Sequence, residues 1–280
     1  MSVLVPRTVD EFEQMLSDAP DATILSGGTD LMVEINLHGR RPATVVSVSK
    51  LEELRQWTVS DDRVVIGAAV PYAVMEHGEL ASALPALAEA ARTVGSPQIR
   101  AAGTLGGNLG TCSPAGDGLP VLAALDATIH VRGNGTRRDV PFAEFMVGVK
   151  RNSLQPGEFV HSVSLHRNKG WQGYAKVGTR NAMVIATASA CLVRDDIRGR
   201  VNVALGAVGP TIIRCTDAEQ WISTTLAGQT STRPPDSVIG EFGRRVASAS
   251  RPIDDHRSTA DYRRHAIGVL ARRLLERSYQ

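Results

Sequence analysis

The sequence predicts an α+β protein with α/β-like lobes, and three patterns in its 280 residues support this fold class. Near the N-terminus, helical stretches alternate with apolar strand-like stretches around a Gly-Gly turn. Residues 182–193 and 201–208 are apolar runs joined by a charged turn, which is typical of a β-hairpin. From Thr259 onward, apolar side chains recur at helical spacing. Hydrophobic residues at 42% and charged residues at 21% are typical of a folded globular chain.

The first region is expected to form a small α/β unit. Thr8 can cap a helix, and Glu11 follows it three residues later, as in a capping box. A short apolar strand at 22–25 ends at the Gly-Gly turn, where glycine allows a sharp change of chain direction. An amphipathic stretch at 30–37 and a β-branched strand at 43–48 complete the unit.

The second region is expected to mix strands and helices. Pro71 is suited to the first turn of a helix, and the Ala-rich residues 84–92 favour a helix by propensity. Residues 95–117 hold six glycines and are expected to form loops. The expected strands are 63–68, 128–131 and 158–165, with a hairpin turn at 133–135.

The third region is expected to hold the hairpin described above, a helix at 217–225, a loop at 227–235 and the last helix. The face predicted for the last helix comprises Tyr262, Ala266, Val269, Leu270, Arg273 and Leu274. From Arg233 onward the basic residues are all arginine, which is consistent with a solvated helical surface or with an interaction surface.

Composition and charge exclude several classes of protein. A formal net charge of +2 and 4% aromatic residues argue against a nucleic-acid binder. Three cysteines, Cys112, Cys191 and Cys215, do not support a disulfide framework or an all-cysteine iron–sulfur cluster. Redox chemistry in this chain would therefore need an organic cofactor. The apolar run at 182–193 is too short for a transmembrane helix, and no signal peptide pattern is found, so a cytoplasmic protein is expected.

Two glycine-rich loops are the strongest candidates for a ligand site. The first, at 25–31, lies where a strand ends and a helix starts, so its backbone amides are suited to a phosphate. The second, at 102–111, is also rich in glycine and threonine, so the same argument for a phosphate applies to it. The nearby Asp117 can accept hydrogen bonds from sugar or polyol hydroxyls. Together the two loops favour a dinucleotide rather than a mononucleotide as the ligand. A plain strand–helix turn for the first loop, and an apolar glycine corner for the second, remain alternatives.

The standard motifs for other nucleotide and hydrolase sites are missing. The sequence contains no P-loop, no Gly-x-Gly-x-x-Gly that follows a strand, and no Gly-x-Ser-x-Gly elbow. The pattern therefore indicates neither a P-loop nucleotidase, nor a Rossmann site, nor an α/β-hydrolase.

Five segments resemble one known family in the same order along the chain. They are Ser-Gly-Gly-Thr-Asp-Leu at 26–31, Arg-Ala-Ala-Gly-Thr-Leu-Gly-Gly-Asn-Leu at 100–109, Ser-Pro-Ala-Gly-Asp at 113–117, Tyr-Ala-Lys-Val-Gly-Thr-Arg at 174–180 and Asp-Tyr-Arg-Arg at 261–264. The chain thereby resembles the FAD-binding (medium) subunit of molybdenum hydroxylases of the xanthine dehydrogenase and aerobic carbon monoxide dehydrogenase type.

The resemblance implies a fold and a division into domains. It implies an FAD-binding domain of the p-cresol methylhydroxylase type at 1–172, with lobes at about 1–55 and 56–172. A small α+β C-terminal domain of the carbon monoxide dehydrogenase flavoprotein type would follow at 173–280.

The same resemblance implies the residues that hold FAD. The two loops would bind the pyrophosphate, Asp117 the ribityl or ribose part, and Val160 and Lys176 would contact the ring system. The implied binding residues are Ile24, Leu25, Ser26, Gly27, Gly28, Thr29, Asp30, Leu31, Thr104, Leu105, Gly106, Gly107, Asn108, Thr111, Ser113, Asp117, Val160 and Lys176. No catalytic residue and no metal ligand is implied.

The roles of two side chains are left open by the sequence, and a third has an expected structural role. Lys176 is either this flavin contact or an ordinary surface lysine, and Tyr174 lies near the ring or in the core. Cys112 is expected to be a small buried residue.

The resemblance also implies a function within a complex. A large molybdopterin-binding subunit would oxidise the substrate, and a small subunit with two-iron two-sulfur clusters would pass electrons to FAD on this chain and then to an external acceptor. A dimer of heterotrimers is the expected assembly. Carbon monoxide, purines, aldehydes and other heterocycles remain open as substrates, and NAD, a quinone and oxygen remain open as acceptors. A free-standing FAD-dependent oxidase or dehydrogenase and a flavin-free scaffold subunit are the alternatives.

Overall fold

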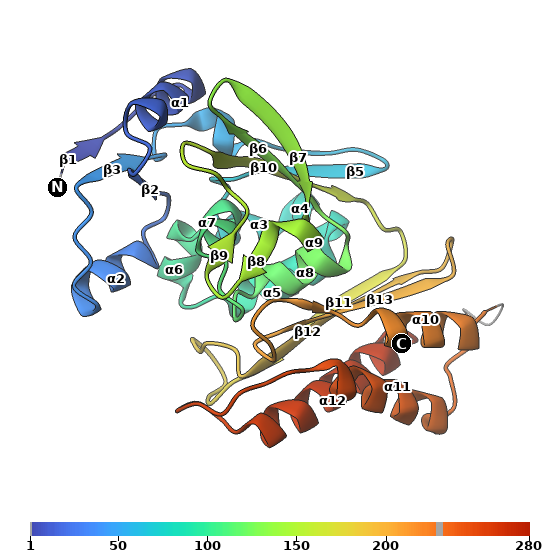
Figure 1. The fold of residues 1–280 in the computed structure, drawn as a ribbon. Helices are drawn as coiled ribbons and strands as arrows, with labels where there is room; N and C mark the ends of the chain where they lie inside the picture. Colours follow the sequence, from blue (N-terminus) through green and yellow to red (C-terminus); the bar gives the residue numbers. More distant parts are fainter. Residues whose placement is uncertain (1, 228–231) are drawn as a thin grey trace.

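The first part of the chain builds a small parallel sheet with two helices (Figure 1). The structure is a computed structural model that describes residues 2–227 and 232–280. The strand order is β1-β3-β2, and both pairs are parallel. The elements are β1 (Ser2–Leu4), α1 (Val9–Asp18), β2 (Thr23–Leu25), α2 (Leu31–Leu37), β3 (Thr44–Ser47) and the 3-10 helix η1 (Glu52–Arg55). The order of helix, strand, glycine turn, helix and strand predicted from the sequence is confirmed.

Helix α1 and helix α2 differ in how they pack. The Thr8 side chain accepts a hydrogen bond of 3.1 Å from the Glu11 amide, as expected for the cap of α1. Helix α1 buries Phe12, whose ring meets the Phe159 ring edge-on at 4.7 Å between centroids. In contrast, α2 buries none of its residues although most of them are apolar. The α2 helix therefore adds little to the buried core, and an ion pair from Lys150 to Glu34 ties it to the rest of the fold.

The second part of the chain forms a five-stranded antiparallel sheet with the strand order β4-β5-β10-β6-β7. Its strands are β4 (Trp57–Val59), β5 (Arg63–Gly67), β6 (Thr128–Gly133), β7 (Thr136–Pro141) and β10 (Phe159–His166). Helices and a small hairpin fill the connections: α3 (Tyr72–Met75), α4 (Gly78–Ala83), α5 (Pro85–Thr93), α6 (Pro97–Ala102), α7 (Leu105–Thr111), α8 (Gly118–Ala124), α9 (Phe142–Phe145), β8 (Met146–Gly148) and β9 (Arg151–Asn152). The predicted hairpin turn is confirmed, with Asn134 and Gly135 at positive φ between β6 and β7.

The second glycine-rich segment differs from the prediction, because residues 97–102 and 105–111 are helices rather than loops. Ser96 caps α6, and Thr104 caps α7 by accepting a hydrogen bond from the Gly107 amide. Leu105 and Leu109, four residues apart on α7, are fully buried. Capping and burial therefore outweigh the low helix propensity of glycine in α7.

The C-terminal part is a four-stranded antiparallel sheet with the order β11-β12-β13-β14 and three helices. The elements are β11 (Trp171–Val177), β12 (Ala188–Asp195), β13 (Arg200–Gly206), β14 (Ile213–Arg214), α10 (Thr216–Thr225), α11 (Asp236–Ala249) and α12 (Ala260–Arg277). The predicted hairpin forms, but its first strand starts at Ala188, six residues later than expected. Residues 228–231 of the predicted loop lie outside the described residues.

The buried face predicted for the last helix was partly wrong. Ala266 and Leu274 are buried as expected, whereas Tyr262 is 50% exposed. The buried face is rotated toward Arg263, Ala266, Ile267, Gly268, Ala271, Leu274 and Leu275. Arg263 belongs to this face because its guanidinium donates to the carbonyls of Thr187 and Ala207 and pairs with Asp255.

The C-terminal sheet lies between two layers of helices, with α5 and α8 on one side and α10, α11 and α12 on the other (Figure 1). Polar contacts join this sheet to the earlier helices. Arg214 donates to the Ala123 carbonyl at 2.6 Å, and Asn202 donates to the Ala124 carbonyl at 2.8 Å. In this packing β11 lies against α5, and the side chain of Lys176 on β11 reaches Asp117 at the N-terminal end of α8. Within the part of the chain that the structure describes, no helix is long and apolar enough to cross a membrane.

Candidate flavin site

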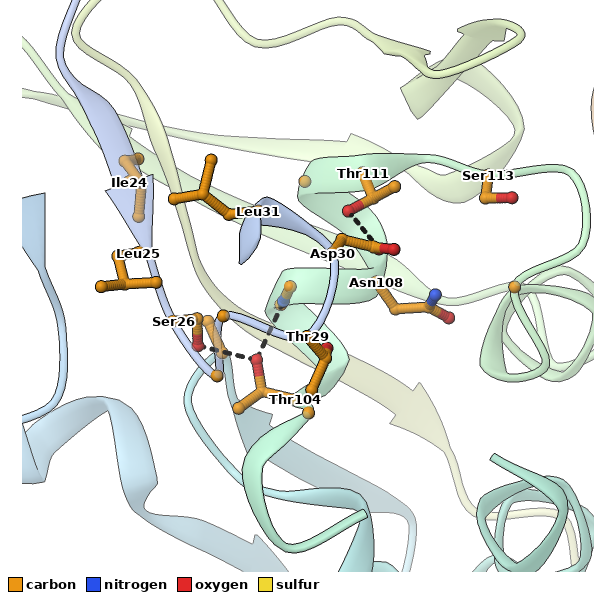
Figure 2. A pocket seen from close by; sticks show the side chains of 18 of the residues that line it. Ile24, Leu25, Ser26, Thr29, Asp30, Leu31, Thr104, Asn108, Thr111 and Ser113 are labelled. Carbon is orange, nitrogen blue, oxygen red and sulfur yellow. Dashed lines mark hydrogen bonds between the residues drawn. The ribbon is translucent and has the colours of Figure 1, made fainter. Parts of the chain in front are cut away.

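A cavity of about 890 Å³ is lined by β2, the loop that precedes α2, helix α7 and residues 183–185. Figure 2 shows the part of its wall where side chains of the two glycine-rich segments face one another. All predicted site residues line this cavity except Leu105 and Lys176. Those on the wall are Ile24, Leu25, Ser26, Gly27, Gly28, Thr29, Asp30, Leu31, Thr104, Gly106, Gly107, Asn108, Thr111, Ser113, Asp117 and Val160. The tertiary fold thus brings both glycine-rich segments to one cavity.

The first loop presents a run of unpaired backbone amides to the cavity. Among the described residues, none of the N–H groups of 26–30 donates to a protein acceptor. Gly28 adopts a positive φ of +71°, which glycine tolerates without strain. Backbone amides that lack a protein partner need water or a ligand. A row of such donors on a cavity wall suits a phosphate or pyrophosphate.

Two hydrogen bonds hold the first loop against α7 (Figure 2). Ser26 Oγ and Thr104 Oγ1 lie 2.9 Å apart, and Thr111 Oγ1 donates to Asp30 Oδ2 at 2.8 Å. Gly27 is required for the close approach, because a Cβ there would lie 1.8 Å from the Ala102 carbonyl oxygen. Gly27 therefore serves loop packing, which the sequence alone did not distinguish from ligand contact.

The amides at the start of α7 differ from those of the first loop, because the protein itself uses them. The Gly106 amide donates to the Ala68 carbonyl at 2.9 Å, the Gly107 amide to Thr104 Oγ1 at 2.9 Å, and the Asn108 amide to the Thr104 carbonyl at 3.0 Å. The second segment therefore contributes side chains and the Cα atoms of its glycines to the cavity wall, but no unpaired amide at residues 106–108.

Asp117 and Lys176 form a buried ion pair beside the cavity. The side chains are 8% and 7% exposed, and Lys176 Nζ lies 2.6 Å from Asp117 Oδ2. Nζ also donates to the carbonyls of Thr93 at 2.8 Å and Val184 at 3.0 Å. Three acceptors around one Nζ use all three protons of an ammonium group. Lys176 is therefore no surface lysine, and its donors point to Asp117 and to backbone rather than to the cavity.

Tyr174 completes this cluster from the core. It is 4% exposed, and its hydroxyl donates to Asp117 Oδ1 at 2.8 Å. Burial raises the pKa of the Asp117 carboxyl, and the bonds from Lys176, Tyr174 and Thr93 oppose that rise. Asp117 lines the cavity with its remaining acceptor capacity, which suits the hydroxyl of a sugar or polyol.

Several cavity residues were not predicted from the sequence. They include Glu34, Arg40, Tyr72, Lys150, Asn152 and Val184. They are spread over two helices, one strand and three loops, so no local motif marks them. Lys150 bridges to Glu34 across the wall at 2.8 Å, and the hydrogen bond from Lys150 lowers the pKa of Glu34. Arg40 also lines this wall, together with the acidic side chains of Asp21 and Asp30.

The cysteines are expected to be unreactive in the native protein. Burial raises the pKa of Cys112 and of Cys215 to about 12, and it also raises that of Cys191. A disulfide reagent in mildly alkaline buffer should therefore label none of the three until denaturant is added, because the thiolate is the reactive form. Rapid labelling of one thiol per native chain would contradict the buried positions.

Comparisons with known proteins assign both parts of the chain to known families. Residues 1–166 match the family described as FAD binding domain in molybdopterin dehydrogenase, and residues 174–278 match the CO dehydrogenase flavoprotein C-terminal domain. The chain is 36% identical over 190 residues to the nicotinate dehydrogenase FAD-subunit of Eubacterium barkeri, with 65% of this chain and 64% of that protein covered. It is 28% identical over 277 residues to the xanthine dehydrogenase FAD-binding subunit of Escherichia coli O157:H7, which covers 96% and 92% of the two chains.

A solved structure has the same fold. It is the carbon monoxide dehydrogenase of Hydrogenophaga pseudoflava that lacks the Mo-pyranopterin moiety, with a TM-score of 0.87 and 26% identity over 98% of this chain and 95% of that one. The predicted fold class and family are thereby confirmed. The chain belongs to the family of FAD-binding domains in molybdopterin dehydrogenases and is the FAD-binding oxidoreductase subunit of a molybdenum hydroxylase.

Proposed function

We propose that this chain holds FAD in the 890 Å³ cavity and passes electrons from two-iron two-sulfur clusters on a partner to an external acceptor. The observation that carries the proposal is the run of unpaired amides at 26–30 on the wall of that cavity. The loop has several unpaired N–H donors available for a pyrophosphate. When bound, FAD supplies redox chemistry, while the protein supplies binding and orientation.

Each predicted residue has a proposed part in binding. The loop at 24–31 would donate to the pyrophosphate, and the wall formed by Thr104, Gly106, Gly107 and Asn108 would face it from the other side. Thr111 and Ser113 would flank the bound group, and Asp117 would accept from the ribityl or ribose hydroxyls. Val160 would supply apolar contact.

Leu105 and Lys176 would act from behind this wall. Leu105 is fully buried and anchors α7 in the core. Lys176 holds Asp117 on one side and the Val184 carbonyl on the other, so it would position both cavity residues rather than touch the flavin.

The partners and the domain division are part of the same proposal. A large molybdopterin-binding subunit and a small iron–sulfur subunit would complete the enzyme, in a dimer of heterotrimers. Two relatives are named as an FAD-subunit and an FAD-binding subunit, which supports separate partner chains. We propose the boundary between the FAD-binding domain and the C-terminal domain at 172/173, which lies within β11 after its second residue. The buried, unpaired cysteines support a cytoplasmic location, where thiols stay reduced.

The test is purification of the tagged chain from its native host under mild conditions. We expect a flavin absorption spectrum, copurification of two further chains, and molybdenum and iron in the complex. A colourless chain that takes up no added FAD would contradict the proposal and favour the scaffold alternative. Turnover of alcohols or phenols by the isolated yellow chain would instead favour a free-standing flavin oxidase or dehydrogenase.

A further inference from the structure

Tyr72 is a buried cavity residue that has no part in the proposal above. It is 3% exposed and lies at the start of α3, directly after Pro71. The Tyr72 hydroxyl donates to Asn108 Oδ1 at 2.8 Å. Within residues 2–227 and 232–280, the hydroxyl makes no other hydrogen bond. Burial raises the pKa of the phenol well above its usual range, so the hydroxyl stays protonated and acts as a donor.

The chain makes room for this pair with two glycines. A Cβ on Gly116 would lie 2.6 Å from Asn108 Nδ2, and a Cβ on Gly118 would lie 2.6 Å from Tyr72 Oη. Glycine on both sides of Asp117 therefore lets the amide and the phenol approach the start of α8. The two glycines that flank Asp117 therefore leave the space that the Tyr72–Asn108 contact needs.

The contact decides which end of the Asn108 amide meets the cavity. With Oδ1 used by Tyr72, the Nδ2 amino group has no protein partner in the described chain, and Asn108 lines the cavity. In the opposite orientation Nδ2 would donate to the phenol oxygen, and the buried O–H group of Tyr72 would be left without an acceptor, which is costly. The orientation therefore follows from the hydrogen-bond requirement of Tyr72.

We propose that Tyr72 is a positioning residue, which turns Asn108 so that its amino group donates to an anionic oxygen of the FAD pyrophosphate. The inference rests on the proposed function. A donor at this position complements the free amides at 26–30, which face the same cavity from the first loop. A freely rotating Asn108 would present its oxygen to the phosphate part of the time and repel it.

The test measures the FAD dissociation constant of the full chain by titration of the apoprotein. Tyr72→Phe keeps the ring and removes only the hydroxyl, and we expect binding to weaken about tenfold, as for one hydrogen bond to a charged group. Asn108→Ala should weaken binding at least as much. The double variant should bind within about twofold of Asn108→Ala, because Tyr72 acts through Asn108.

Two further variants separate positioning from general packing. Tyr279→Phe removes a hydroxyl that is buried in the C-terminal part, away from the cavity, and should leave FAD affinity unchanged. Asn108→Asp keeps the acceptor for Tyr72 but removes the amino group, so it should bind FAD more weakly than Asn108→Ala.

Three outcomes would overturn the inference. The first is wild-type FAD affinity in Tyr72→Phe, and the second is wild-type FAD affinity in Asn108→Asp. The third is a double variant whose loss of FAD affinity equals the product of the losses in the two single variants. If instead the wild-type chain bound no FAD, the proposed function would fail first and the inference with it.

Discussion

The Lys176→Met variant is expected to lose about 3–5 kcal/mol of unfolding free energy, because it leaves a buried carboxylate without its cation. Asp117 and Lys176 are both less than one-tenth exposed and are joined at 2.6 Å. The variant also removes the donors to the carbonyls of Thr93 and Val184. The loss should be largest near neutral pH and smaller in acid, because protonated Asp117 needs no cation and burial already raises its pKa.

Urea unfolding of four chains measures this effect. Lys169→Met makes the same substitution at an exposed lysine and should change the unfolding free energy by less than about 0.5 kcal/mol. The double variant Asp117→Asn/Lys176→Met removes both charges and should be more stable than Lys176→Met alone. Equal losses in Lys176→Met and Lys169→Met would show that the ion pair does not stabilise the fold.

Gly27→Ala is expected to weaken FAD binding by about a hundredfold or more. The added Cβ would lie 1.8 Å from the Ala102 carbonyl oxygen and 2.9 Å from the Gly103 nitrogen, so the loop must move away from α6. Moving the loop withdraws the free amides at 26–30 from the cavity wall. Loss of two such bonds to a charged group is worth about 3 kcal/mol or more, which is about a hundredfold in affinity.

Titration of the apoprotein with FAD checks this prediction, and melting of the apoprotein shows whether the core persists. Gly240→Ala is the matched control, because its Cβ would meet only the end of the Arg244 side chain at 3.7 Å within the described chain. Gly107→Ala should be milder than Gly27→Ala, since its Cβ would meet Thr104 Oγ1 at 3.1 Å and no backbone. Wild-type FAD affinity in Gly27→Ala would refute the role of the first loop.

The sequence predicted the elements whose signals are local. Thr8 caps α1, the turn at 133–135 joins β6 and β7, and the charged turn joins β12 and β13, because each depends on neighbouring residues. Helix α7 was predicted as a loop because glycine has a low helix propensity, whereas Leu105 and Leu109 bury the helix in the core. Such burial depends on the rest of the fold and cannot be read from a short window.

The glycine-rich motifs by themselves favoured a dinucleotide ligand, and the resemblance they carry led to the confirmed FAD family. The tertiary structure alone decided how each residue serves the site. In the structure, the α7 amides donate to acceptors within the protein. Lys176 donates to Asp117, and the Tyr72 hydroxyl donates to Asn108. A sequence motif describes only residues that are neighbours along the chain. Pairs such as Asp117 and Lys176, 59 positions apart, depend on how the C-terminal sheet packs against α5 and α8.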